Sequence, residues 1–261
     1  VNYQLGKLYL DKKEPVKALS IMRQASELLP NSEQGKMINA NMRTIFADLY
    51  NGDQLTQLSP VDALTLYSEF PELVPKGAEG DTLARHLAEH LADADLLARA
   101  IDLMQKQVDR LSGAEGAGVA LRLAGLQIQD NKPQAALDNL TKADHYLEAV
   151  TPEDGDVKRR QSAMLRAKAN SMLGKTEDAF RALALLPQDS DVLKLRADIA
   201  WKAKKWQDAA DSLEKIITGE NISLTRPITE DQANEILNWA VALYLADNRY
   251  VLANLRERYG D

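Results

Sequence analysis

Alanine recurs along this chain among the same kinds of neighbour, and this repetition constrains the fold more than any other feature. Most copies have a small residue twelve positions before them and a large apolar residue four positions after them. Such repetition is typical of arrays in which each unit packs mainly on its neighbours. The sequence therefore predicts about seven similar units. The recurring alanines, 30 to 45 residues apart, are Ala18, Ala63, Ala100, Ala136, Ala179, Ala209 and Ala253.

The neighbours of these alanines are those that a close crossing of two helices requires. Small side chains let the helix axes approach, and large apolar side chains fill the space beside the crossing. Asn51 and Glu257 depart from the pattern. Because Asn51-Gly52 is a turn signal, we expect a long loop up to Pro60 inside the second unit, and we interpret the last unit as a worn cap. The small positions are Gly6, Ala88, Ala124, Ala167, Ala197 and Val241; the large ones are Met22, Tyr67, Met104, Leu140, Leu183 and Leu213.

The first copy carries the fullest pattern, over residues 1–32. Leu5, Gly6 and Tyr9 are followed by Ala18, Met22, Ala25 and Pro30, and Pro30 is expected to end the second helix. This segment resembles the tetratricopeptide repeat family, although the later spacings depart from its period of 34 residues. The resemblance implies an all-α fold, a right-handed α-solenoid of about seven degenerate helix-turn-helix repeats. It also implies that Trp206 and Tyr250, three residues before their alanines, pack inside their hairpins.

One stretch suggests a division of the chain. Pro71, Pro75, Gly77 and Gly80 disfavour a continuous helix between residues 71 and 80. We expect amino-terminal hairpins with an inserted loop over 1–77 and continuing repeats over 78–261, with one continuous solenoid as the alternative. Because Val1 stands in the middle of a repeat, we expect the chain to be a fragment of a longer protein.

Composition excludes several classes of function. The net charge of −7 and the pI near 5.2 argue against binding to a phosphate backbone, which requires clustered Lys and Arg. No run of 18 apolar residues is present, so we expect no membrane insertion. With no Cys, thiolate nucleophiles, thiolate metal sites and disulfides are excluded. The absence of Cys favours the bacterial periplasm slightly over the cytoplasm.

One motif invites an enzymatic interpretation. The run His86-Leu87-Ala88-Glu89-His90 matches H-x-x-E-H, in which two histidines four residues apart hold zinc on one helical face. Leu87 and Ala88, however, also fit the packing positions of the repeat. No phosphate-binding or nucleophile-elbow motif occurs. We therefore expect neither a metal nor another cofactor, and no enzymatic activity.

A binding surface follows from the resemblance. In the family, the first helix of each repeat lines a concave groove, which implies a protein or peptide as the partner, while end-to-end stacking of copies is a related possibility. The Lys and two Asn with which some members clamp a terminal carboxylate are not found at the matching positions. The predicted groove residues are Tyr3, Lys7, Arg85, Glu89, Gln129, Lys168, Lys194, Asp198, Trp201, Lys202 and Asn238.

Trp201 stands out among them, because an exposed tryptophan in a groove is a typical anchor for a partner. Packing between adjacent units is the alternative for Trp201, and both interpretations stay open. The leading functional hypothesis is a scaffold that holds a peptide or helix of another protein. Its rivals are a non-catalytic helical region of a larger enzyme or envelope protein, and a structural spacer.

The predicted crossing can be tested at Ala18. We expect Ala18→Trp to lower the free energy of unfolding by about 1–3 kcal/mol, because overpacking a close helix crossing forces side chains and backbone apart. Thermal unfolding of the variant measures the effect. An unchanged melting temperature would contradict the register.

Overall fold

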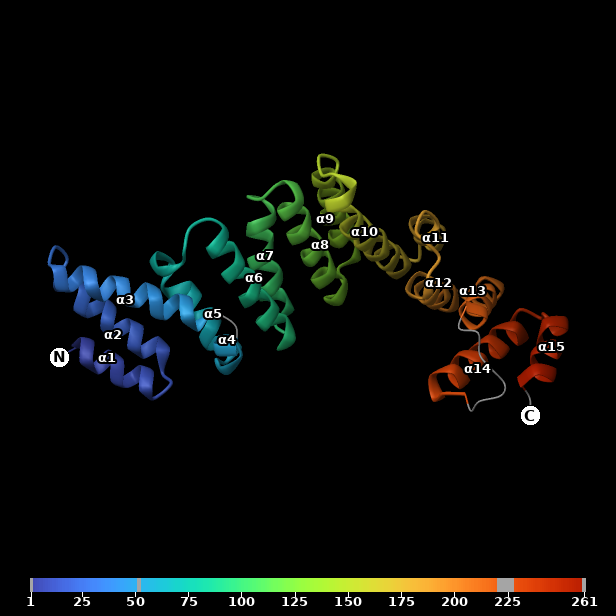
Figure 1. Cartoon of the computed structure of the whole chain (residues 1–261), viewed down its shortest axis with the longest axis horizontal. Coiled ribbons are helices and arrows are strands. Elements are labelled where there is room, and N and C mark those ends of the chain that lie inside the picture. The colour runs from blue at the N-terminus through green and yellow to red at the C-terminus, as the bar shows by residue number, and fades with distance from the viewer. Residues whose placement is uncertain (1, 51–52, 220–227, 260–261) are drawn as a thin grey trace. The chain divides into compact units, whose positions relative to one another are not determined.

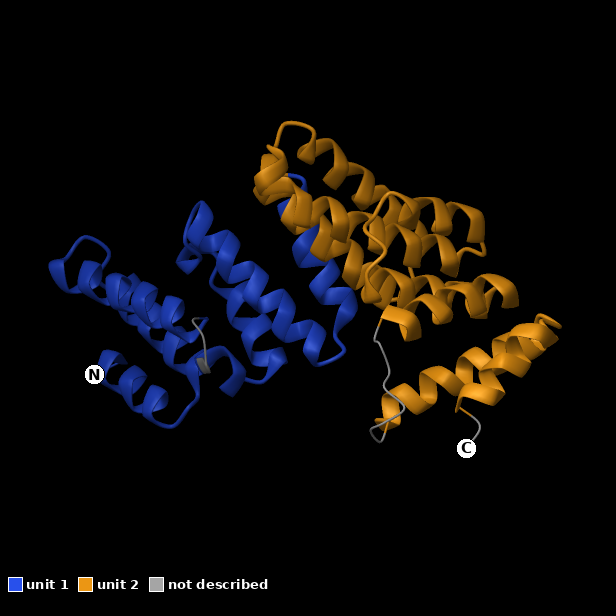
Figure 2. Cartoon of the chain, turned by 45° about the vertical axis from the view of Figure 1, so that its right-hand side comes forward, with its two compact units in different colours: residues 1–109 blue, residues 110–261 orange. Residues whose placement is uncertain are grey.

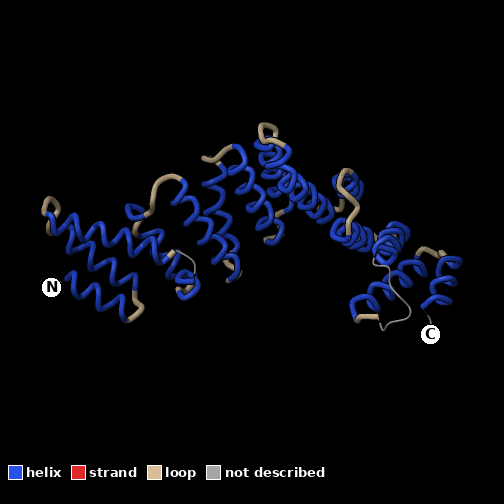
Figure 3. Tube along the Cα trace, viewed as in Figure 1, coloured by secondary structure: helices blue, strands red, loops and turns tan. Residues whose placement is uncertain are grey.

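The computed structural model describes residues 2–50, 53–219 and 228–259. Within these ranges the chain forms helices and no strand (Figures 1 and 3). None of the described helices is both long and apolar enough to span a bilayer. The helices are α1 (Asn2–Asp11), α2 (Pro15–Glu27), α3 (Glu33–Leu49), α4 (Asp53–Gln57), α5 (Pro60–Glu69), η1 (Pro71–Leu73), α6 (Ala78–Asp93), α7 (Leu97–Val108), α8 (Gly113–Gln129), α9 (Pro133–Leu147), α10 (Pro152–Met172), α11 (Thr176–Ala184), α12 (Ser190–Lys202), α13 (Trp206–Gly219), α14 (Glu230–Leu245) and α15 (Arg249–Tyr259).

These helices form seven hairpins in the described part of the chain. Six of them join two consecutive helices. In the remaining one, α3 and α5 are linked through Tyr50, which follows α3 and whose hydroxyl donates to the Ala63 carbonyl oxygen of α5. The hairpins belong to two compact units, Val1–Asp109 and Arg110–Asp261 (Figure 2). Inside the second unit, α10 packs on both helices of the preceding hairpin and on α12 of the next one. This stacking confirms the predicted all-α fold of repeated helical hairpins.

The segment expected as a loop inside the second hairpin contains a short helix. Leu55 of this helix is buried, and α4 contacts α3 and α6. Ser59 then caps α5 by accepting a hydrogen bond from the Asp62 backbone N–H. Residues 51 and 52, which carry the turn signal, lie outside the described residues. The expected division near residue 78 coincides with the beginning of α6, inside the first unit.

Six of the seven recurring alanines occupy the helix crossings as predicted. Each of the six, from Ala18 to Ala209, is completely buried. At the first crossing, a Cβ added to Gly6 would lie 2.7 Å from Met22 Cγ, so no larger side chain fits there without displacement. Small residues at these positions are therefore what allows the two helices of a hairpin to approach.

The seventh position was predicted wrongly. Ala253 is exposed and Val241 is 37% exposed, whereas Leu252 and Ala240 pack against the core of the second unit. The crossing in the last hairpin is therefore one residue earlier than expected, with a leucine in place of the alanine. Tyr250 is correspondingly not in the aromatic position, and it is 79% exposed instead of packed inside the hairpin.

The turns between paired helices share a conformation that fixes this register. In six hairpins the residue five positions before the crossing has a positive φ. The next residue donates its backbone N–H to a carbonyl five residues earlier, as Lys205 does to Ala200 at 2.8 Å. This is a Schellman turn, which satisfies the last carbonyls of the first helix. The residues with positive φ are Lys13, Asp95, Asn131, Gly174, Lys204 and Asp247.

Gly174 and Gly125 make a matched pair that tests the turn. A Cβ added to either would meet no atom within 4 Å, but Gly174 has a φ of 71° and Gly125 lies inside α8. We expect Gly174→Ala to lower the free energy of unfolding by about 1 kcal/mol, because an L-residue is strained at positive φ. Gly125→Ala should raise it by about 0.5–1 kcal/mol, because alanine restricts the unfolded chain and favours helix. Urea denaturation of both variants measures the two changes in the free energy of unfolding. Changes of the same sign would contradict the assignment of a strained left-handed turn at Gly174.

Candidate functional site

The predicted groove residues divide between the two units. In the first unit, Tyr3 and Lys7 are brought together, with the Lys7 ammonium 4.9 Å from the centre of the Tyr3 ring. Asn41 of α3 donates to the Tyr3 hydroxyl at 2.6 Å. Arg85 donates to Thr82 on its own helix at 3.0 Å. Tyr3 is thereby linked to α3, whereas Lys7 and Arg85 contact residues of their own helices.

In the second unit, the structure brings four of the predicted residues together around one hollow. This Trp201 hollow has a volume of about 400 Å³ and lies among α12, α13 and α14. Apolar side chains from α12 and α13 line it together with polar groups from α12 and α14, which suits a hollow that selects one kind of side chain. Its lining residues are Lys194, Ala197, Asp198, Trp201, Leu213, Ile216, Glu235 and Asn238.

A second hollow lies on the other side of α12. This Lys168 hollow, of about 240 Å³, is formed by α8, α10 and α12, and it includes the predicted residues Lys168, Asp198 and Lys202. Gln129 is exposed at the end of α8 and does not line it. Asp198 lines both hollows, so the two adjoin at α12. The remaining lining residues are Ile128, Ser171, Met172, Leu195 and Ile199.

Trp201 combines the two roles considered for it. Its ring meets the ring of Trp206 edge to face, with centroids 5.5 Å apart, and it packs partly against the core of the second unit. The same side chain lines the hollow. The contact with Trp206 lies within one hairpin, so it fixes the indole in place while part of its surface faces the hollow. A fixed aromatic group binds with little loss of conformational entropy.

The charged side chains that line the hollows form two ion pairs. Lys194 Nζ lies 3.0 Å from Glu235 Oε1, which links α12 to α14, and Lys202 Nζ donates to Asp198 Oδ2 at 2.7 Å. Glu235 Oε2 is buried and has no hydrogen-bond donor among the described residues. Sequence reasoning missed Glu235. Its position one helical turn before Asn238 was the available signal, because residues three apart share a helical face.

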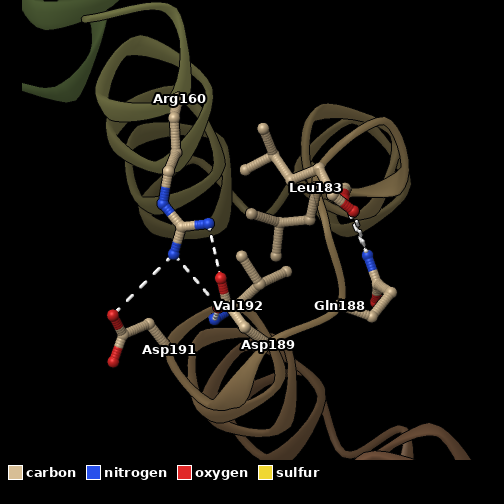
Figure 4. Close-up of polar contacts among 7 residues, drawn as sticks. Arg160, Leu183, Gln188, Asp189, Asp191 and Val192 are labelled. Carbon is tan, nitrogen blue, oxygen red and sulfur yellow. Dashed lines mark hydrogen bonds and ion pairs between the residues drawn. The ribbon is translucent and has the colours of Figure 1, made fainter. Parts of the chain in front are cut away.

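A bidentate ion pair sets the position of α12 against α10 (Figure 4). The Arg160 guanidinium donates to both carboxylate oxygens of Asp189, at 2.6 and 3.0 Å. Asp189 also caps α12 by accepting from the Val192 backbone N–H at 3.2 Å. The hydrogen bond from Arg160, followed by that from Val192, lowers the pKa of Asp189 below its usual range. The joint therefore links the first helices of two successive repeats.

The H-x-x-E-H residues lie on one face of α6 without forming a larger cluster. The Nε2 N–H of His90 donates to the carbonyl oxygen of Leu58 at 3.0 Å. His86, on the preceding turn, is partly buried, and Glu89 is exposed. Across residues 2–50, 53–219 and 228–259, no three His, Asp or Glu side chains are placed to hold a metal ion.

Comparison with known proteins finds a likeness among solved structures alone. No family model matches the chain, and no curated protein matches it. A similar solved structure is a tetratricopeptide repeat protein from Parabacteroides merdae, which is 15% identical in sequence. The match covers 98% of this chain and 96% of that one, with a TM-score of 0.47. Function has to be argued from the residues of this chain.

The joint between α10 and α12 predicts a specific dependence on pH. Because the pKa of Asp189 is lowered in the folded state, its ion pair contributes stability above about pH 4, the usual range of an unfolded Asp, and that contribution is lost as the pH falls through the lower folded value. Asp189→Asn retains a capping oxygen but loses the ion pair. We expect the variant to melt below the wild type at pH 7 and the difference to vanish towards pH 2.

Circular-dichroism melting at several pH values measures this difference. Asp191→Asn is the matched control, because Asp191 lies 3.8 Å from Arg160 and its side chain is 79% exposed. It should change the melting temperature less than Asp189→Asn does. A deficit for Asp189→Asn that persists unchanged at pH 2 would show that the ion pair is not its cause.

Proposed function

We propose that the chain is a non-catalytic scaffold whose second unit binds an extended segment of a partner protein across α8, α10, α12 and α14. The observation that carries the proposal is the pair of adjoining hollows on consecutive first helices. Each hollow combines apolar lining with charged side chains. Such a series of side-chain pockets along an exposed surface is a common mode of peptide recognition.

The chemistry of the described residues supports a protein partner. Trp201 offers an aromatic surface fixed by Trp206, and tryptophan is enriched among residues that contribute most to protein interfaces. Asn238 is exposed and offers an amide to hydrogen-bond a peptide backbone. The net charge of −7 disfavours nucleic acid as the partner. A spacer that binds nothing would have no need of these groups in one hollow.

Selection from a random peptide library displayed on phage tests this proposal. We expect the full chain to enrich peptides, and we expect these peptides to bind the Trp201→Ala variant at least tenfold more weakly than the wild type. Loss of an interface anchor that contributes about 2 kcal/mol corresponds to more than a tenfold change in Kd. Tyr250→Ala, which removes an exposed aromatic outside both hollows, should bind the peptides like the wild type.

Asn238→Ala provides a second variant, since Asn238 is exposed and its loss leaves the Trp201–Trp206 contact intact. This variant should bind the same peptides several-fold more weakly and should have the melting temperature of the wild type. If no peptide is enriched, or if both hollow variants bind unchanged, the groove is not the binding surface and the spacer or the region of a larger protein becomes the better explanation.

A further inference from the structure

The Trp201 hollow has an excess of acidic groups. Two carboxylates line it, Asp198 and Glu235, against one ammonium group, that of Lys194, while Lys202, the partner of Asp198, lies outside this hollow. Lys194 contacts Glu235 Oε1, while Glu235 Oε2 is buried without a donor among the described residues. A buried charged acceptor that lacks a hydrogen bond is costly, and a donor supplied from outside would offset that cost. The hollow is therefore prepared for a group that is positively charged and donates hydrogen bonds.

The other lining residues suit the methylene groups and the planar guanidinium group of an arginine side chain. Ala197, Leu213 and Ile216 present apolar atoms, along which the methylene groups of a long basic side chain can lie. Trp201 supplies an aromatic ring, on which a guanidinium group stacks more favourably than an ammonium group does. The guanidinium also has five donors to share between two carboxylates and the Asn238 amide oxygen.

The Lys168 hollow has the opposite balance. Two ammonium groups, on Lys168 and Lys202, line it with the single carboxylate of Asp198. The two hollows flank α12, and packed helices lie about 8–10 Å apart. An extended chain rises about 3.3 Å per residue, so roughly three residues bridge that distance. Charge therefore alternates along the surface at a spacing that one short segment can span.

From these contacts we infer that the groove recognises a partner segment with a basic residue, preferably arginine, in the Trp201 hollow and an acidic residue about three positions away in the Lys168 hollow. This inference rests on the proposed peptide-binding function and adds the chemistry of the partner. It assigns Glu235 and Asp198 as the residues that select the basic side chain.

The test uses synthetic peptides made from the enriched library sequences. We expect these sequences to carry Arg or Lys, with Asp or Glu about three residues away. Replacement of the basic residue by Gln should weaken binding about ten- to hundredfold, as measured by isothermal titration calorimetry. Glu235→Gln should cause a similar loss, and Asp198→Asn a loss of about threefold, since Asp198 is exposed. Glu214→Gln, which removes the same charge from an exposed site on α13 that lines neither hollow, should have no effect.

Lys194→Met distinguishes a hollow that takes a basic side chain from one that takes an acidic side chain, because the two predict changes in peptide affinity of opposite sign. Removing this ammonium takes away a positive charge that competes for Glu235 and keeps an apolar stem, so peptides with Arg should bind several-fold more tightly. If the hollow instead takes an acidic side chain, the same variant binds more weakly.

The three tryptophans of the chain, at 201, 206 and 239, give three indole N–H signals in a nitrogen-correlated NMR spectrum. Titration with the arginine peptide should shift the Trp201 signal most. Enriched peptides without a basic residue, or weaker binding by Lys194→Met, would overturn this inference and leave the peptide-binding function standing. Failure to enrich any peptide would overturn both.

Discussion

Most of the hairpins in the described part of the chain depend on a close helix crossing at a small side chain. Six buried alanines, from Ala18 to Ala209, occupy these crossings, and at the first of them Gly6 leaves room for Met22. Because the two helices of a hairpin touch there, their outer faces are left to pack against the next hairpin. Stability is then distributed over many similar contacts between neighbours and is not concentrated in one central core.

The candidate binding surface is a consequence of that stacking. In the second unit α10 packs on α8 and on α12. Polar contacts link the first helices of successive hairpins: Arg160 with Asp189 between α10 and α12, and Lys194 with Glu235 between α12 and α14. Spaces between adjacent helices become the two hollows. The residues that align the repeats and those that line the surface therefore overlap at Lys194 and Glu235, so substitutions there have to be judged by both stability and binding.

The sequence predicted the repeated crossings well, because small residues at a fixed offset leave a mark that survives irregular spacing. It failed in the last hairpin, where Leu252 replaces the alanine and the neighbouring Ala253 offered a false match. It also gave no indication of the left-handed turns, since five of the six residues with positive φ are Lys, Asp or Asn and not Gly. Six of the predicted groove residues line the two hollows, but Glu235 was missed because its importance arises from contact with Lys194 on another helix. Pairings of that kind depend on tertiary structure, which a single sequence does not display.

The left-handed turns have a consequence for how this protein can change over evolutionary time. Residues such as Lys13, Asp95 and Lys204 each hold the backbone in a conformation that costs an L-residue of order 1 kcal/mol. All of them stand between helices, and none lines either hollow. Each turn is therefore a site at which glycine can relieve that strain without altering the surface that meets a partner. Such local relief gives the array room to accept otherwise destabilising substitutions in its groove, so its binding preference can diverge while its architecture is preserved.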